Sequence, residues 1–146
     1  MFDNAFRFLE KTFAQSQEMV MFVTEITAGY DTSWFVENFG CDPADIRAAI
    51  GPNIGQCHFE TDRDVPDAAL ATFGAAAEPY IRKAGAKYYV NLKEINALIL
   101  RRAGVRNITV SDACTMCDPD RFWSHRVTKG DRGSQGAVIT CREVEV

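Results

Sequence analysis

Apolar residues near the start of the chain follow the period of a helix. Four large side chains recur there at intervals of three or four positions: Phe2, Phe6, Leu9 and Phe13. An aromatic stripe at this spacing is typical of a helix face that packs in a core or an interface. The run from Met19 to Val23 is continuously apolar instead. Its pattern fits a buried helix and a buried strand equally well.

Beyond residue 30 the pattern alternates between helical periods and short apolar runs. Helices are expected at 32–39, 64–73, 78–83 and 92–103, and strands at 46–50, 56–60, 108–110, 122–126 and 137–141. Asp42 before Pro43 is typical of a helical N-cap and first position, and Gly40 and Gly104 are typical of helix ends. Strands separated by helices predict an α/β fold in which flanking helices cover a mixed sheet.

The composition is that of a soluble globular protein. The 146 residues are 47% hydrophobic and 25% charged, which suffices for one domain with a core. We divide them into a helical segment at 1–30 and a domain at 31–146. The net charge of -4 argues against a nucleic-acid partner, and no apolar run approaches the roughly 20 residues of a membrane span. Without a signal-peptide start or a disulfide pattern among the five cysteines, we expect the cytoplasm.

Residues 49–60 read AIGPNIGQCHFE and combine backbone-shaping residues with polar ones. Gly51 and Gly55 permit a positive φ or a close backbone approach, and Pro52 fixes its own φ. The segment is either a tight turn between two buried strands or the wall of a pocket. In a pocket, Asn53 can offer its amide to a ligand, and a glycine its backbone N–H.

Cys57 and His58 follow this turn. On a strand, neighbouring side chains point to opposite faces, so we expect that the two do not pair and that at most one faces a pocket. A small buried thiol and a half-buried imidazole are the structural alternatives. The candidate pocket residues are Asn53, Gly55, Cys57 and His58.

Cys114 and Cys117 form a Cys-x-x-Cys pair. This spacing lets two thiolates share one tetrahedral metal ion, but a zinc site normally needs four ligands. The sequence has no second pair of this kind, so Cys57, His58 or His125 can complete a site only through the fold. A structural metal site, a redox dithiol and plain turn residues remain open as interpretations.

A basic cluster follows near the end of the chain, with anion-binding candidates at Arg121, Arg126 and Arg132. Arginine suits bidentate contacts with phosphate or carboxylate groups. Aspartates interleave with these arginines, so solvated surface pairing is the structural alternative. The chain has no phosphate loop, dinucleotide fingerprint or Gly-x-Ser-x-Gly motif.

Taken together, these motifs resemble the laccase-domain family, also called multicopper polyphenol oxidases or peptidoglycan editing factors. The similarity runs over about residues 36–141 and rests on five segments, at 51–60, 91–93, 114–117, 121–126 and 133–139. The resemblance implies the C-terminal half of that fold. It also implies a zinc or copper cofactor in the full-length protein. The implied substrates are purine nucleosides and phosphate, with phosphorylase and adenosine deaminase activities.

The resemblance further implies that family members have a metal site in the N-terminal half of their domain. Its ligands are a His, a Cys and a second His, and the second His lies within a His-Ala-Gly-Trp-Arg-Gly motif. The only histidines of this chain are His58 and His125, and neither precedes the glycine-proline turn. We therefore expect no catalytic residue and no catalytic metal here, and little activity from the chain alone. The rival hypothesis is a non-catalytic interaction module that forms a homodimer or pairs with a separate N-terminal half.

Overall fold

The computed structural model describes residues 20–23, 36–37, 40, 42–129, 131 and 133. Within this part the strands form two sheets, and the mixed α/β class expected from the sequence is confirmed. The parallel sheet has the order β1-β2-β6, with β1 at Val20–Val23, β2 at Arg47–Ile50 and β6 at Asn107–Val110. The antiparallel sheet has the order β3-β5-β4, with β3 at Glu60–Thr61, β5 at Lys87–Val90 and β4 at Ile81–Ala84.

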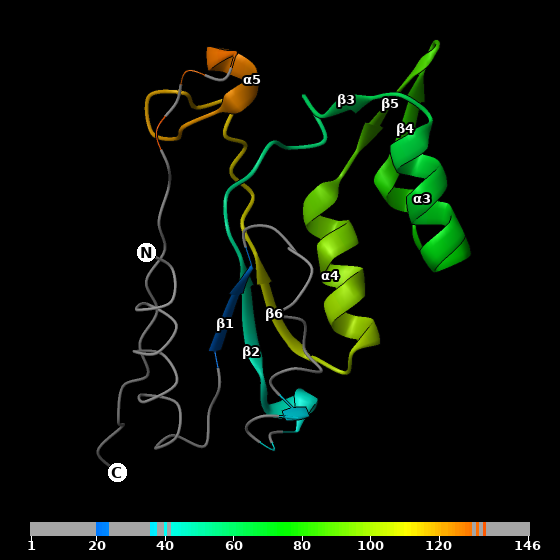
Figure 1. Cartoon of the computed structure of the whole chain (residues 1–146), viewed down its shortest axis with the longest axis vertical. Helices are drawn as coiled ribbons and strands as arrows, with labels where there is room; N and C mark the ends of the chain where they lie inside the picture. The colour runs from blue at the N-terminus through cyan, green and yellow to red at the C-terminus, as the bar shows by residue number, and fades with distance from the viewer. Residues whose placement is uncertain are drawn as a thin grey trace.

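In the described part of the chain, the helices that accompany the sheets are α3 at Asp64–Phe73, α4 at Leu92–Arg102 and α5 at His125–Thr128. Figure 1 shows α4 between the parallel sheet and α3, with α5 at one end of the molecule. Short 3₁₀ helices occupy Pro43–Asp45, Gly74–Ala76 and Glu78–Tyr80. Among the described residues, no helix has both the length and the apolar character needed to cross a bilayer.

The core lies where β2 meets α4. Ile46, Ala48 and Ile50 are 0%, 3% and 2% exposed, because β2 is the central strand of the parallel sheet. Ala97 and Leu100 of α4 are buried against them. Burial of these apolar side chains stabilises the sheet, and it holds β2 in a fixed position relative to β6.

Several predicted elements are confirmed, and one ambiguity is resolved. The strands expected at 46–50 and 108–110 and the helices at 64–73 and 92–103 are present. The apolar run that left helix and strand open forms β1, which pairs in parallel with β2. Gly104 has φ 95° just after α4, and Gly40 has φ 65° and donates its N–H to the Val36 carbonyl. Both glycines therefore end helical segments as expected.

Three predicted elements are wrong. The strand expected at 56–60 is a turn at 56–58 followed by the short β3. The helix expected at 78–83 is one 3₁₀ turn followed by β4, since its period spans less than two turns and a partner strand, β5, pairs along it. Residues 122–126 do not form a strand: residues 122–124 are irregular, and His125 begins α5. The segment pairs with none of the described strands.

Other expectations concern parts of the chain that the structure does not describe. The aromatic stripe at residues 2–13 and the strand at 137–141 lie there. Only residues 36–37 of the expected helix at 32–39 are described, and they are helical. The domain boundary near residue 30 stays a prediction, although β1 shows that residues 20–23 belong to the parallel sheet.

Candidate metal centre

Two loops meet at one edge of the parallel sheet. Since β2 and β6 are parallel neighbours, their carboxyl ends lie together, and so do the loops that follow them. Backbone bonds join the loops: the Ser111 N–H donates to the Ile50 carbonyl at 2.9 Å, and the Thr115 N–H to the Asn53 carbonyl at 3.0 Å. Asn53 also forms a single parallel bridge with Cys114. The fold thus places the glycine-proline turn beside the Cys-x-x-Cys pair.

Each loop then turns sharply. In the first, the N–H groups of His58 and Phe59 both donate to the Gly55 carbonyl, at 3.0 and 2.9 Å. In the second, the N–H of Cys117 donates to the Cys114 carbonyl at 3.1 Å. Because residues 56–58 form a turn, the expectation that Cys57 and His58 point to opposite faces of a strand is wrong. Both side chains reach the same place.

The ligand atoms of Cys57, His58, Cys114 and Cys117 all lie within 4.8 Å of one another. The Sγ atoms of Cys57 and Cys117 are 3.7 Å apart. His58 Nδ1 lies 3.7 Å from Cys114 Sγ and 3.4 Å from Cys117 Sγ. Cys114 is buried, His58 is half-buried, and the other two thiols are exposed. We call these four residues the thiol–imidazole cluster. Such a donor set can hold a metal ion.

The thiols of the cluster differ in acidity. Burial opposes ionisation of Cys114 most strongly. Hydrogen bonds from the backbone of Gly55 and Met116, from the His58 side chain and from the Cys117 backbone outweigh it, and they lower the Cys114 pKa from 9.0 to about 6. Hydrogen bonding with Cys57, then with Cys114, raises the pKa of Cys117 to about 11. Cys114 is therefore a stronger acid than Cys117.

The backbone of Gly55 lies close to the cluster. Its N–H donates to Cys114 Sγ at 3.1 Å. A Cβ at this position would lie 3.1 Å from Cys114 Cβ and 3.2 Å from Cys57 Sγ. Neither Gly51 nor Gly55 is among the described glycines with positive φ. Close approach, and not a left-handed backbone, is therefore the reason for glycine at position 55.

Lys93 fixes the loop from the other side. This residue of α4 is 5% exposed, and its Nζ donates to the Ala113 carbonyl at 2.8 Å. Ala113 directly precedes Cys114, and its own N–H donates to Ser111 Oγ at 3.3 Å. A buried ammonium group that bonds the backbone beside the ligand positions Cys114 for the cluster.

The cluster could hold a metal ion, contrary to the expectation of no cofactor in this chain, in which Cys114 and Cys117 were only weak metal candidates. The sequence showed the Cys114 and Cys117 pair, but nothing in it joined Cys57 and His58 to that pair. His125, the other histidine considered as a fourth ligand, is exposed at the start of α5 and is not part of the cluster. The signal that was available is topological: two parallel strands whose alternate residues are apolar and at least partly buried, each followed by a loop that contains cysteine.

The other candidate site residues have different surroundings. The side-chain oxygen of Asn53 is buried and has no hydrogen-bond partner among the described residues. Arg121 pairs with Asp118 at 3.3 Å on the surface. Arg126 donates to the Glu60 carbonyl at 3.4 Å and lies 5.8 Å from the Phe59 ring centre. Arg132 lies outside the described residues, so a shared anion site for these arginines stays a prediction.

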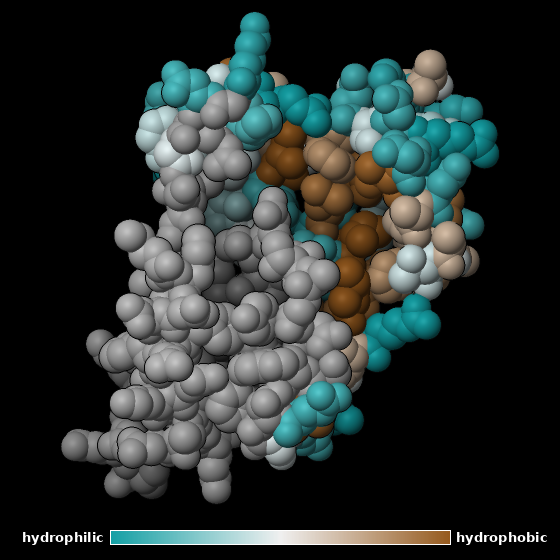
Figure 2. All heavy atoms as spheres, viewed as in Figure 1, coloured by the Kyte–Doolittle hydropathy of each residue, from teal (hydrophilic) through white to brown (hydrophobic). Residues whose placement is uncertain are grey.

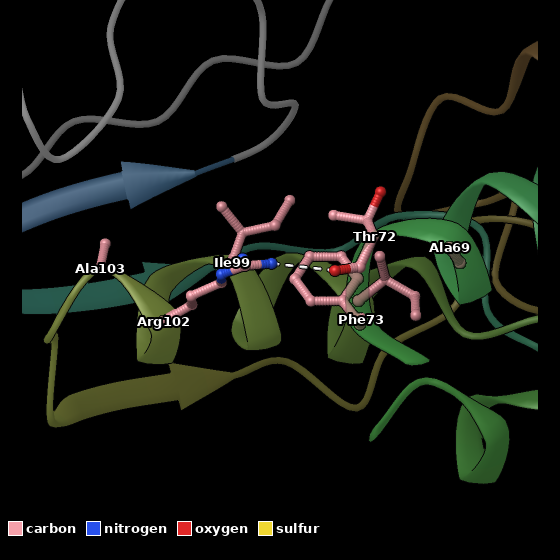
Figure 3. A pocket seen from close by; sticks show the side chains of 7 residues that line it. Ala69, Thr72, Phe73, Ile99, Arg102 and Ala103 are labelled. Atoms are coloured by element: carbon pink, nitrogen blue, oxygen red, sulfur yellow. Dashed lines mark hydrogen bonds between the residues drawn. The ribbon is translucent and has the colours of Figure 1, made fainter. Parts of the chain in front are cut away.

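A separate groove lies between α3 and the C-terminal part of α4. It has a volume of about 530 Å³, and its lining residues are Ala69, Thr72, Phe73, Ile95, Ile99, Arg102 and Ala103. Figure 3 shows Arg102 reaching across it to the Thr72 carbonyl, a hydrogen bond of 2.9 Å. Figure 2 shows hydrophobic residues gathered over α4 and toward α3. The groove shares no residue with the thiol–imidazole cluster, and no cysteine, histidine or carboxylate lines it.

The fold is an α/β fold, and the four side chains at the carboxyl ends of its parallel strands could hold a metal ion. These features fit the broad class of α/β metalloproteins. The particular family is identified by its sequence. The family model described as "Multi-copper polyphenol oxidoreductase laccase" matches residues 27–142. The chain therefore belongs to the laccase-domain family, and the resemblance found in the motifs is confirmed.

Individual relatives agree with this assignment. The chain is 37% identical over 111 residues to purine nucleoside phosphorylase YlmD of Bacillus subtilis (strain 168), which covers 75% of this chain and 40% of that protein. It is 40% identical over 104 residues to the protein of the same name from Geobacillus stearothermophilus, and this match covers 69% of this chain and 38% of that protein. A crystal structure of the Bacillus licheniformis hypothetical protein YfiH matches with a TM-score of 0.63 and 36% identity, covering 67% and 38%. The chain thus spans about two fifths of the length of these relatives.

Proposed function

We propose that this chain forms the C-terminal portion of a laccase-domain enzyme that cleaves purine nucleosides with phosphate. In this reaction phosphate oxygen forms a bond to the ribose C1′ as the bond from C1′ to the purine nitrogen breaks. The products are ribose 1-phosphate and the purine base. The observation that carries the proposal is the identity of 37–40% with two proteins named for this activity, over most of the chain.

The role we assign to the chain is to supply one wall of the substrate pocket. The glycine-proline turn and the Cys-x-x-Cys loop lie side by side at the carboxyl edge of a parallel sheet, where α/β proteins bind ligands. An unpaired buried amide oxygen is costly. We therefore expect the Asn53 oxygen, unpartnered in the described part of the chain, to meet a nucleoside or the N-terminal portion.

Phosphate is assigned to the arginines near α5. Arg126 is exposed and sits beside Phe59, which follows the glycine-proline turn. Its guanidinium can bind phosphate in a bidentate way when it exchanges the long contacts with the Glu60 carbonyl. Arg121 and Arg132 are the further candidates.

We do not assign the catalytic zinc or copper of the family to residues of this chain. The resemblance places its His-Cys-His ligands in the N-terminal half, and the two histidines of this chain do not reproduce that set. We place the protein in the cytoplasm, where the free thiols of Cys57, Cys114 and Cys117 stay reduced.

The test is a phosphorolysis assay on inosine and adenosine that follows release of the purine base. The chain alone should show little activity. Co-expression with the portion of the Geobacillus relative that precedes the region matched by this chain should restore phosphate-dependent cleavage. In the restored complex, Asn53→Ala and Arg126→Ala should lower kcat/KM. The control variant Arg63→Ala should not, because Arg63 is exposed and pairs with Asp67 of α3.

Three outcomes speak against the proposal. Full activity of the chain alone would show that it needs no second portion. Base release that does not depend on phosphate would replace phosphorolysis by hydrolysis. Failure of the two portions to associate, together with light scattering that shows a stable homodimer of the chain, would favour the non-catalytic interaction module.

A further inference from the structure

We propose that Cys57, His58, Cys114 and Cys117 bind one zinc ion in a closed, structural Cys₃His site. This site differs from the His-Cys-His set that the resemblance implies for catalysis. Its role is to tie the glycine-proline turn to the Cys-x-x-Cys loop, so that the pocket wall keeps its shape. The proposal concerns metal binding by this chain, and it holds or fails independently of any activity on nucleosides.

The distances within the cluster match the edges of a zinc tetrahedron. Zinc lies about 2.3 Å from a thiolate sulfur and about 2.0–2.1 Å from an imidazole nitrogen. Tetrahedral angles then separate two sulfurs by about 3.8 Å, and a sulfur from a nitrogen by about 3.6 Å. The observed separations are 3.7 Å between Cys57 and Cys117 Sγ, and 3.7 and 3.4 Å from His58 Nδ1 to two sulfurs. All ligand atoms lie within 4.8 Å of one another. The other ligand-to-ligand distances therefore need to shorten by about 1 Å at most to match the tetrahedron.

The kind and number of donors select zinc and a structural role. Three thiolates and one imidazole in a tetrahedral arrangement are typical of zinc, while calcium and magnesium require oxygen ligands. Four protein ligands fill a tetrahedral site, so no position is left for water or substrate. A catalytic zinc ion keeps such a position open. The cluster is therefore suited to hold the two loops together and not to activate a reactant.

The surroundings support a metal-bound thiolate at Cys114. The Gly55 N–H donates to its sulfur at 3.1 Å, and a Cβ at position 55 would crowd Cys114 Cβ at 3.1 Å and Cys57 Sγ at 3.2 Å. Lys93 holds the preceding carbonyl of Ala113. Hydrogen bonds of this kind to and beside a ligand fix its orientation around a metal ion. They converge on the one sulfur of the cluster that is buried.

The site joins parts of the chain that are far apart in sequence. Cys57 and Cys117 are 60 positions apart, and each lies in a turn outside the regular strands. A zinc ion that binds the folded form and not the unfolded chain stabilises the fold by its binding free energy. Loss of zinc should therefore loosen both loops while the core between β2 and α4 persists.

A disulfide between Cys57 and Cys117 is the competing use of the same atoms. Their 3.7 Å contact permits oxidation to a disulfide by an external oxidant, with loss of two protons and two electrons. An oxidised pair would leave only Cys114 and His58 as donors, too few for a structural zinc site. Zinc content and the disulfide therefore exclude each other, and one experiment distinguishes them.

The test is metal analysis of the full chain, expressed with added zinc and purified anaerobically without chelators. We expect one zinc ion per chain. After removal of zinc, titration with Co²⁺ should give the visible bands of tetrahedral cobalt together with a thiolate-to-cobalt charge-transfer band. Zinc added back should raise the melting temperature.

Substitutions assign the ligands. Cys114→Ser and His58→Gln should lose zinc, whereas His125→Gln, the matched histidine outside the cluster, should retain it. His58→Cys should keep one zinc ion and strengthen the charge-transfer band of the cobalt form, which gives a readout even where the serine variant does not fold. Wild-type protein without zinc, a Cys57–Cys117 disulfide in the mass spectrum, or full zinc retention by both Cys114→Ser and His58→Gln would overturn the proposal.

Discussion

The parallel and antiparallel sheets each have three strands among the described residues, but they place functional side chains differently. In the parallel sheet, β2 and β6 end at the same edge, and the two following loops bring four ligating side chains within 4.8 Å. In the antiparallel sheet, β4 and β5 are joined by a tight hairpin at Gly85, with φ 62°, and run in opposite directions. Successive loops of such a sheet lie at opposite edges, so they do not gather a site.

The two sheets also differ in how they are held. Strand β2 is buried between its neighbours and α4, with Ile50 only 2% exposed. The antiparallel sheet relies more on contacts at its surface. Lys87 bonds Asp62 at 2.6 Å, and the Tyr89 hydroxyl donates to Glu60 at 2.8 Å, all between exposed groups. Buried contacts and the cluster should therefore dominate stability, and the surface contacts of the antiparallel sheet should add little.

The largest expected effect is on the core of the parallel sheet. Ile50→Ala removes a buried side chain at the end of β2, next to the glycine-proline turn, and should cost about 2–5 kcal/mol. Urea unfolding measures the loss. Ile81→Ala, at a half-buried position in β4, is the matched change in the antiparallel sheet and should cost less. Equal losses from the two variants would contradict the contrast between the sheets.

A smaller effect is expected from crowding at the cluster. Gly55→Val introduces a Cβ 3.1 Å from Cys114 Cβ and further methyl groups beyond it, so the loops must separate. Overpacking of this kind costs about 1–3 kcal/mol. The variant should also bind less zinc, which metal analysis measures. Gly55→Ala should fall between the wild type and the valine variant in both properties. An unchanged melting temperature and zinc content in both variants would show that the loops yield freely.

How far the sequence could predict this structure depended on whether the signal was local. The helix at 64–73 and the α4 helix with its Gly104 end were found because period and terminator lie within one segment. The strand expected at 56–60 was wrong because the Gly55 carbonyl takes the N–H groups of His58 and Phe59, which no periodicity reveals. For the same reason the thiol–imidazole cluster stayed one of several open interpretations, since choosing Cys57 and His58 as partners of the pair required both that turn and the parallel pairing of β2 with β6.

The third prediction tests the support behind the cluster. Lys93→Met keeps much of the apolar stem of this buried residue but removes the hydrogen bond to the Ala113 carbonyl. Loss of a hydrogen bond to this partly buried carbonyl should cost about 1 kcal/mol, and the loop before Cys114 should become less ordered. We expect a lower melting temperature and faster release of zinc to a chelator. Lys83→Met, an exposed lysine of β4, is the matched control and should change neither. A Lys93→Met variant that releases zinc at the wild-type rate would remove Lys93 from the support of the site.

The smallest effect is expected at the surface of the antiparallel sheet, and it depends on pH. The hydrogen bond to Asp62, followed by the charge of that carboxylate, raises the pKa of Lys87 above 10.5. Because the folded pKa lies above the unfolded one, this contact stabilises the fold fully below pH 10.5, and the stabilisation is lost as the pH rises through the folded pKa. Asp62→Asn should therefore lower the melting temperature slightly at neutral pH, and the difference from wild type should vanish in strong alkali. High salt should shrink the same difference at neutral pH, since the pair is exposed. A difference that persists unchanged through both titrations, measured by circular dichroism, would mean that Asp62 acts through something other than its charge.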